Sequence, residues 1–279
     1  MKQFFILIKQ ALNKEKIFII LGIFGLLVIS MHYTYSQSVF SSGYMSYYKD
    51  APLEFFYYIQ LTGVNPFVLM ILMILLPNLV SYHLLDMHQN QTTYFIETRI
   101  GKRKYYLETF ICNILFTFIT IFIIEVGLLL VIHLFYGKVV FLSQNYPEGY
   151  YPLTQTICHN ELINLILFLN LTSLGYALLS SVLFSLQVFI SHKYIYRCLG
   201  VVFAIALIVV PILVMNYFPI KDLSVLFQIT PLIAVGVEQV RDNPFGLSNI
   251  LHYFATFSIY TIISFVLYKI LYDWRKYND

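Results

Sequence analysis

The chain contains six long apolar stretches separated by shorter, more polar segments. A hydrophobic helix needs about 20 residues to cross a hydrocarbon core of ~30 Å, and each stretch approaches or exceeds that length. All are rich in leucine, isoleucine and phenylalanine, and none holds a lysine or arginine at its centre. The pattern predicts an all-α membrane protein with six transmembrane helices, at about 17–31, 66–85, 106–135, 162–190, 199–217 and 250–271.

Two further segments are apolar but too short to be added to these spans. Residues 3–13 mix apolar and basic positions directly before the first span, which predicts a helix lying in the membrane interface. Residues 218–249 contain an apolar run interrupted by Pro231, which predicts an external re-entrant hairpin packed against the bundle. The predicted outer loop at about 32–64 is rich in tyrosine, a residue that favours the boundary between water and lipid.

The composition agrees with a location in the lipid bilayer. Apolar residues make up 59% of the 279 residues and charged residues 11%, against about 45–50% and about 25% in globular proteins. A soluble protein of this size could not remove so much apolar surface from water. Residues 1–279 are therefore interpreted as a single transmembrane domain. Disorder and nucleic-acid binding are excluded, and three scattered cysteines form no disulfide framework or metal-ligand spacing.

Lysines and arginines are distributed unequally among the predicted loops. Cytoplasmic loops of membrane proteins carry an excess of these residues. With the amino terminus inside, only Lys49, Lys138, Lys221 and Arg241 fall on the outer side. The residues that then fall inside are Lys2, Lys9, Lys14, Lys16, Arg99, Lys102, Arg103, Lys104, Lys193, Arg197, Lys269, Arg275 and Lys276. The pattern predicts a multi-pass protein with both termini in the cytoplasm.

The predicted cytoplasmic segment between the second and third spans, residues 87–105, mixes aromatic, polar and charged residues. Within Asn90–Thr98, Thr98 lies four positions after Tyr94 and three after Phe95, so the three residues would share one face of a helix. A short helix with aromatic and charged faces, held between two spans, indicates a contact surface for another protein.

Gly101 follows this segment and predicts the end of its helix. The basic run from Lys102 to Lys104 comes next, where it would meet lipid phosphates. Taken alone, the basic run is explained by an anchor that sets the topology of the chain. Such an anchor does not require the short helix that precedes it.

This segment resembles the permease subunits of ATP-binding-cassette exporters, the six-span type common in Gram-positive bacteria. The resemblance rests on Leu76-Pro77 inside the second span, Asp86 at its end, and the run Tyr94-Phe95-Ile96-Glu97-Thr98-Arg99-Ile100-Gly101-Lys102-Arg103-Lys104-Tyr105. It extends more loosely over the chain through the predicted interfacial helix, six spans and hairpin. The chain departs from the family at His88-Gln89-Asn90-Gln91, where members often carry Glu and Gly, and at Glu108, where they often have Lys.

The resemblance implies a permease that is not itself an enzyme. The chain has no GxxxxGK[ST] motif, so ATP and Mg would be bound by a separate cytoplasmic ATP-binding-cassette ATPase subunit, with no cofactor in this chain. That subunit would hold the short helix in a surface groove. The implied coupling residues are Asn90, Thr93, Tyr94, Glu97, Thr98, Arg99, Gly101, Lys102 and Arg103.

Six spans are half of such a pore, so a second permease copy or a similar permease is expected as a partner. The two halves would move cargo by alternating between inward- and outward-facing packings. An amphipathic cargo such as a peptide, lipid or hydrophobic drug fits the apolar and aromatic spans, and antimicrobial peptide export or immunity fits the family. The implied location is the cell membrane of a bacterium.

Polar residues inside the predicted spans are candidates for the translocation path, because they are costly in lipid. Pro77 and Asn78 would kink the second span, either as a flexing point or as an ordinary packed kink. Glu125 lies 19 residues beyond Tyr106, roughly 28 Å along a helix, which predicts a solvated carboxylate near the outer interface. Asn170 and Thr172, together with Asn164, Ser173 and Gly175, would either line the path or provide hydrogen bonds and close packing between helices.

Two other classes of protein were considered. An intramembrane enzyme would need paired carboxylates, HExxH or GxSxG, and the chain contains none of these. A secondary transporter or channel driven by an ion gradient remains the main alternative. It predicts broken helices with charged residues near the midplane, and Pro77 is a clear mid-span breaker.

Overall fold

The computed structural model describes residues 14–36, 51–61, 65–89, 92–141, 153–190, 192–217, 225–237 and 247–278. These residues are mostly helical and none of them forms a β-strand, which confirms the all-α fold class. The predicted interfacial helix at 3–13 and the predicted coupling residue Asn90 lie outside the described residues.

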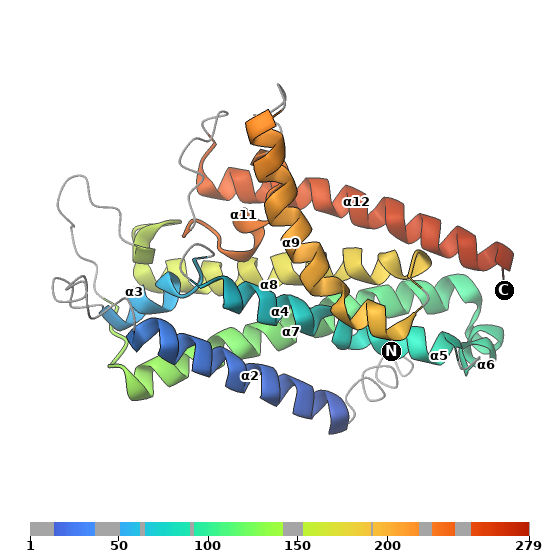
Figure 1. Cartoon of the computed structure of the whole chain (residues 1–279), viewed down its shortest axis with the longest axis horizontal. Helices are drawn as coiled ribbons and strands as arrows, with labels where there is room; N and C mark the ends of the chain where they lie inside the picture. Colours follow the sequence, from blue (N-terminus) through green and yellow to red (C-terminus); the bar gives the residue numbers. More distant parts are fainter. Residues whose placement is uncertain are drawn as a thin grey trace.

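The long helices lie side by side along the molecule, with α9 crossing them in front (Figure 1). In chain order the elements are α2 (Lys14–Thr34), α3 (Ala51–Tyr58), α4 (Pro66–Asn78), α5 (Val80–Gln89), α6 (Thr92–Ile100), α7 (Lys102–Phe135), η3 (Leu153–Gln155), α8 (Glu161–Ser185), η4 (Leu186–Val188), α9 (Lys193–Tyr217), η5 (Val225–Phe227), α11 (Thr230–Ile233) and α12 (Asn249–Asn278).

Five stretches of described helix are long and apolar enough to cross a membrane: Lys14–Thr34, Pro66–Met87, Lys102–Phe135, Glu161–Ser185 and Asn249–Asp273. Each covers one predicted span. The predicted span at 199–217 lies in α9, a helix of 25 residues whose side chains are described only in part. The structure therefore agrees with a multi-pass membrane protein, and the sixth span stays a prediction.

One predicted span contains a break, and another ends earlier than predicted. The second span is broken at Leu79, whose ψ of −111° lies outside the helical region, so α4 ends at Asn78 and α5 continues the span. The fourth span does not continue as an α-helix to 190, because α8 ends at Ser185 and passes into the 3₁₀ turn η4. In both cases the apolar run continues past the end of the α-helix, so hydrophobicity alone did not mark the break.

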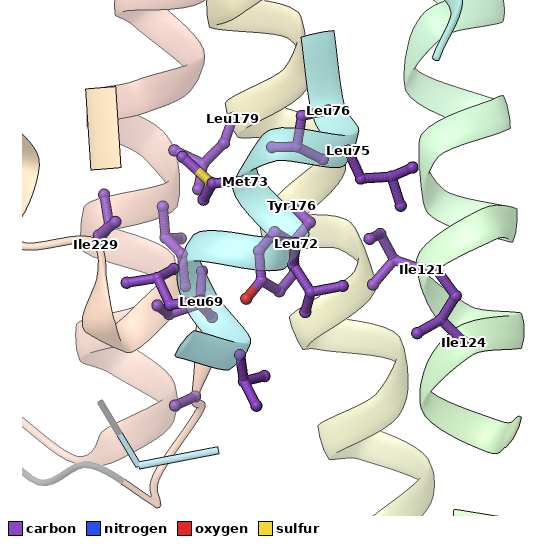
Figure 2. Packing of buried hydrophobic residues seen from close by; sticks show 14 of the residues in the cluster. Leu69, Leu72, Met73, Leu75, Leu76, Ile121, Ile124, Tyr176, Leu179 and Ile229 are labelled. Carbon is purple, nitrogen blue, oxygen red and sulfur yellow. The ribbon is translucent and has the colours of Figure 1, made fainter. Parts of the chain in front are cut away.

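Helix α8 lies at the centre of the bundle, in contact with α4, α7, α11 and α12. Figure 2 shows apolar side chains from α4, α7 and α8 meeting in one cluster, labelled Leu69, Leu72, Met73, Leu75, Leu76, Ile121, Ile124, Tyr176, Leu179 and Ile229. In lipid, close packing and interhelical hydrogen bonds hold helices together more than the removal of apolar surface from solvent does. Both kinds of contact occur in this core.

A polar cluster joins α5, α7 and α8 inside the bundle. Oγ of Ser81 donates to Oδ1 of Asn113 at 2.9 Å, and Nδ2 of Asn113 donates to Oγ of Ser180 at 2.9 Å. Oγ1 of Thr117 donates to the same serine at 3.1 Å. These side chains are fully buried, so each polar group needs the others as partners.

Helices α4 and α9 cross at an unusually close approach. Pro77 lacks an N–H, which leaves the carbonyl of Met73, four residues earlier, without its helical partner. Gly200 of α9 packs on that carbonyl: an added Cβ would lie 1.8 Å from the Met73 oxygen and 3.1 Å from Cδ of Pro77. Pro77 is buried in this contact. Pro77 therefore lies inside a tightly packed crossing of α4 and α9.

Residues 225–237, the described part of the predicted hairpin, lie against α8 and α12. The hydroxyl of Tyr260 on α12 donates to the Phe227 carbonyl at 2.7 Å. Gly175 of α8 leaves room for the Leu232 carbonyl, which an added Cβ would approach to 2.1 Å. The predicted close-packing role of Gly175 agrees with this contact. The position of the hairpin on the outer side of a membrane stays a prediction.

The two ends of the bundle differ in charge. The end at the right of Figure 1 contains α6, the beginning of α7 and α9, and the end of α12. The described basic residues near this end are Lys14, Lys16, Arg99, Lys102, Arg103, Lys104, Lys193, Arg197 and Lys269. Lys138, in contrast, follows α7 at the opposite end. The helices thus collect at one end the residues that the charge pattern assigned to the cytoplasm.

Candidate functional site

The candidate coupling segment forms a separate short helix, α6, between α5 and α7. Its final turn ends at Gly101, whose N–H donates to the Glu97 carbonyl at 2.9 Å. Gly101 has a φ of +87°, a left-handed conformation that glycine adopts without steric cost. Helix α7 begins at the next residue, so one residue separates the short helix from a span of 34 residues. The predicted helix end at Gly101 is thereby confirmed, and the predicted loop 87–105 includes the ends of α5 and α7.

The side chains of α6 are divided between a buried and an exposed side. Thr93 is buried, whereas Tyr94 is 64% exposed and Phe95 is 69% exposed. The two rings lie edge to face with their centroids 6.1 Å apart. Thr98 is also exposed, so the three residues predicted to share a face are all accessible. An exposed aromatic pair is a surface that another protein can contact.

Positive charge surrounds this aromatic pair along the chain. Arg99, Arg103 and Lys104 are exposed, while Lys102 is half-buried and makes an interaction within the structure. Glu97 is also half-buried and has a partner. Of the predicted coupling residues that the structure describes, those free to reach another protein are Tyr94, Thr98, Arg99 and Arg103.

Contacts beside α6 tie α5 to the beginning of α9. Nζ of Lys193 lies 3.4 Å from Oδ1 of Asp86. The guanidinium of Arg197 lies 4.0 Å from the centre of the Tyr82 ring, a cation–π contact. Nδ2 of Asn78 donates to its own helix, at the Ile74 carbonyl, and lies 3.3 Å from the Arg197 carbonyl. Asn78, a candidate for the translocation path, is therefore occupied in joining α4 to α9.

Glu125 is fully buried, and the prediction of a solvated carboxylate is wrong. Its Oε2 accepts a hydrogen bond from Nε2 of Gln60 at 2.7 Å. Distance along the helix correctly placed this residue in the half of α7 away from α6, but residues just beyond α3 cover it there. The partner lies 65 positions earlier in the chain, so the sequence alone gave no sign of it.

The remaining path candidates lie in different surroundings. Asn170 is exposed on the outside of α8, and its Nδ2 donates to the Ile166 carbonyl of its own helix at 2.7 Å. Thr172 is fully buried, and its hydroxyl has no hydrogen-bond partner. The structure does not bring Pro77, Asn78, Glu125, Asn170 and Thr172 together into one path.

The sequence analysis missed the polar cluster around Asn113. The signal was present, because Asn113 and Thr117 are four residues apart and so lie on one face of a helix. Gln187 was also missed: its Nε2 donates to the Ser81 carbonyl at 2.7 Å and extends the cluster towards α9 through Tyr196 at 3.3 Å. These residues fix how the spans pack beside α6.

The described residues contain no group of three or more His, Cys, Asp or Glu side chains that could hold a metal ion. Comparison with known proteins adds no relative: no family model, no curated protein and no solved structure matches this chain. The function of the chain is therefore inferred from the geometry of α6 and from the buried polar groups.

Proposed function

We propose that the chain is the membrane-spanning permease subunit of an ATP-driven exporter, and that a separate cytoplasmic ATPase subunit binds at α6. The observation that carries the proposal is the exposed pair Tyr94 and Phe95 on a short helix joined directly to two spans. The pair lies at the end of the bundle where the basic residues collect. A partner with an apolar groove and acidic edges fits this surface.

Force applied to α6 has a direct route into the membrane. Gly101 is the one residue between α6 and α7, and α7 continues for 34 residues without interruption. On the other side, α5 is joined to α9 through Asp86 and Lys193. A displacement of α6 would therefore move α7 and the α5–α9 pair, which is the kind of motion that alternating access requires.

The remaining parts of the proposal come from the family resemblance. A second copy or a similar permease completes the pore, and the cargo is an amphipathic peptide, lipid or hydrophobic drug. The protein resides in a bacterial plasma membrane with α6 in the cytoplasm. ATP and Mg are bound by the partner, since the chain lacks a phosphate-binding loop.

Co-purification tests this proposal most directly. The wild-type chain, expressed with its cytoplasmic partners and purified in mild detergent, should retain an ATPase subunit. Replacing both Tyr94 and Phe95 by alanine should reduce the retained ATPase at least about tenfold, since aromatic contacts of this kind are often worth 2 kcal/mol or more in an interface. Reversing the charges of Arg99 and Lys102–Lys104 should also weaken the complex.

A matched control pair of aromatic residues lies just before α9 and in its first turn. Phe189 is 65% exposed and Tyr194 is 63% exposed, nearly the values of the α6 pair, and both lie at the same end of the bundle. Replacing these two by alanine should leave the ATPase bound. The proposal is wrong if both double variants lose the partner equally, or if the wild-type chain is active without any ATPase.

The last outcome would favour the alternative of a transporter driven by an ion gradient. One observation agrees with that alternative, because the buried Glu125 is the sort of group that such proteins use to carry a proton or ion. Transport in vesicles separates the two functions. An exporter depends on ATP and its partner subunit, whereas a secondary transporter runs on the purified chain with an imposed gradient.

A further inference from the structure

The outer half of α7 contains a carboxyl group that the proposed coupling at α6 does not use. Glu125 has no exposed surface. Its Oε2 accepts the hydrogen bond from Gln60, and its Oε1 is buried with no hydrogen-bond partner among the described residues. Gln60 lies two residues beyond α3, so this hydrogen bond joins the end of the α3 segment to α7.

Among the residues that the structure describes, no positive charge forms an ion pair with this carboxyl. The ion pairs formed by described residues join Lys104 to Glu108 and Lys193 to Asp86, and Glu125 takes part in neither. The helices α5 and α6 pack against the other half of α7. The described titratable groups on the elements that cover its outer half are Tyr176 and Glu161 on α8, Glu54, Tyr57 and Tyr58 on α3, and His32 and Tyr33 on α2.

These groups are neutral or acidic, or are engaged elsewhere. Tyr176 interacts electrostatically with Glu125 and brings no positive charge. Nδ1 of His32 is 2.9 Å from the Tyr136 hydroxyl, at the end of α7. Glu161 accepts from Oγ1 of Thr154 at 3.3 Å. Within the described part of the chain, an ionised carboxylate at Glu125 would therefore be buried with one amide hydrogen bond as its compensation, which is strongly unfavourable.

A proton fits this site better than a metal ion does. A sodium or calcium ion takes several oxygen ligands, and the described residues provide no acidic cluster here. A proton needs one carboxyl oxygen and one acceptor. Gln60 serves both states of the carboxyl, because its amide nitrogen donates to the ionised form and, after a half-turn, its amide oxygen accepts from the protonated form. The separation of 2.7 Å between the Gln60 amide and Oε2 of Glu125 lies within the range of both an N–H···O and an O–H···O bond.

We propose that Glu125 is a proton-binding site whose protonated form holds α3 on the bundle and whose ionisation releases the α3 segment. The O–H bond of the carboxyl breaks on release, and the proton passes to water that enters as α3 moves away. The proton returns when α3 packs back and excludes that water. This proposal does not depend on an ATPase at α6.

The area covered by α3 makes the release consequential. Leu53, Phe55, Phe56, Tyr57 and Ile59 are all buried between this segment and the rest of the bundle. Their removal would open the end of the protein opposite α6. The site therefore links protonation on that side to access into the bundle.

Infrared spectroscopy of the reconstituted protein tests the first half of the proposal. The wild type at neutral pH should show the C=O stretch of a protonated carboxylic acid, shifted in heavy water. Glu125→Gln should lose this band while keeping the fold, because glutamine has nearly the same shape and can still bond to Gln60. Glu161→Gln, a control at another buried carboxyl, should keep it. A neutral-pH spectrum that Glu125→Gln leaves unchanged would overturn the assignment.

Hydrogen exchange tests the second half. Protection factors for residues 53–60, corrected for intrinsic exchange, should fall by about tenfold per pH unit for one linked proton. The fall begins at the pH where the carboxyl ionises in the released form and levels off where it ionises in the packed form. Glu125→Gln stays neutral, so its α3 amides should remain protected over the same range. Glu161→Gln should behave as the wild type does. Equal pH dependence in wild type and Glu125→Gln, or none in the wild type, would show that the carboxyl does not control α3.

Discussion

The helices α3 and α6 are similar in length and both contain adjacent aromatic residues, but they lie at opposite ends of the bundle in opposite surroundings (Figure 1). In α3, Phe55, Phe56 and Tyr57 are buried against other helices. In α6, Tyr94 and Phe95 are largely exposed. The first helix uses its aromatic residues to complete the fold, whereas the second presents them outward. Aromatic content therefore does not reveal the role of a short helix; its packing does.

The largest effect that this comparison predicts is on Phe56→Ala in α3. The Phe56 ring is fully buried, with its centroid 6.0 Å from that of Phe168 on α8 in an edge-to-face pair. Removing such a ring should lower the free energy of unfolding by about 3–5 kcal/mol. Thermal or denaturant unfolding in detergent measures the loss. If Phe95→Ala on α6 costs as much, the distinction between the two helices is wrong.

A smaller but still large effect is expected at the crossing of α4 and α9. Gly200→Ala would place a Cβ on the Met73 carbonyl and force the helices apart, at a cost of about 1–3 kcal/mol. Gly22→Ala is the matched control, because an added Cβ there meets nothing within 4 Å. That change should be neutral or slightly stabilising in detergent. Equal melting temperatures for the two variants would contradict the close approach.

The hydrogen bond of Tyr57 gives an intermediate test of how α3 is held. Its hydroxyl accepts from Nδ2 of Asn164 at 3.1 Å, and burial raises the pKa of Tyr57, so the phenol stays protonated at neutral pH. Tyr57→Phe should lower the free energy of unfolding by about 1 kcal/mol, since it leaves the buried Asn164 amide with one partner fewer. Tyr58→Phe, on the less buried neighbour, serves as the control. A loss no greater than that of the control would show that this bond does not hold α3.

The smallest effect on stability is expected for Tyr94→Ala combined with Phe95→Ala. Both side chains are exposed and belong to a short helix that contacts only its neighbours α5 and α7 appreciably. The free energy of unfolding of the isolated chain should change by no more than about 0.5 kcal/mol. A large loss of stability would mean that α6 serves the fold and is not held in reserve for a partner.

Much of the fold could be predicted because lipid imposes a simple rule on length and polarity. The apolar runs placed five spans within a few residues of the observed helices. Gly101 marked the end of α6, since a left-handed residue there favours glycine. Gly175 indicated close packing correctly, although the sequence could not show that the Leu232 carbonyl would be its neighbour.

What escaped prediction depends on contacts between residues far apart in the chain. The burial of Glu125 follows from Gln60, which lies 65 positions away. The break at Leu79 follows Pro77, but the packing that stabilises it comes from Gly200 on α9. Nothing in the local sequence of α3 and α6 tells which helix will be covered, because the covering surfaces belong to α7, η3 and other distant elements.

The parallel course of α8 and α12 has a consequence for biogenesis. Oγ of Ser181 and Oγ of Ser264 are 2.6 Å apart, and the Tyr253 hydroxyl donates to the Leu171 carbonyl at 2.8 Å. The partners are 83 and 82 positions apart in the chain, so each group on α8 is synthesised well before its neighbour on α12. Until then Ser181 still has the Leu178 carbonyl of its own helix as a partner. The seam between α8 and α12 is therefore completed only when translation delivers the last helix.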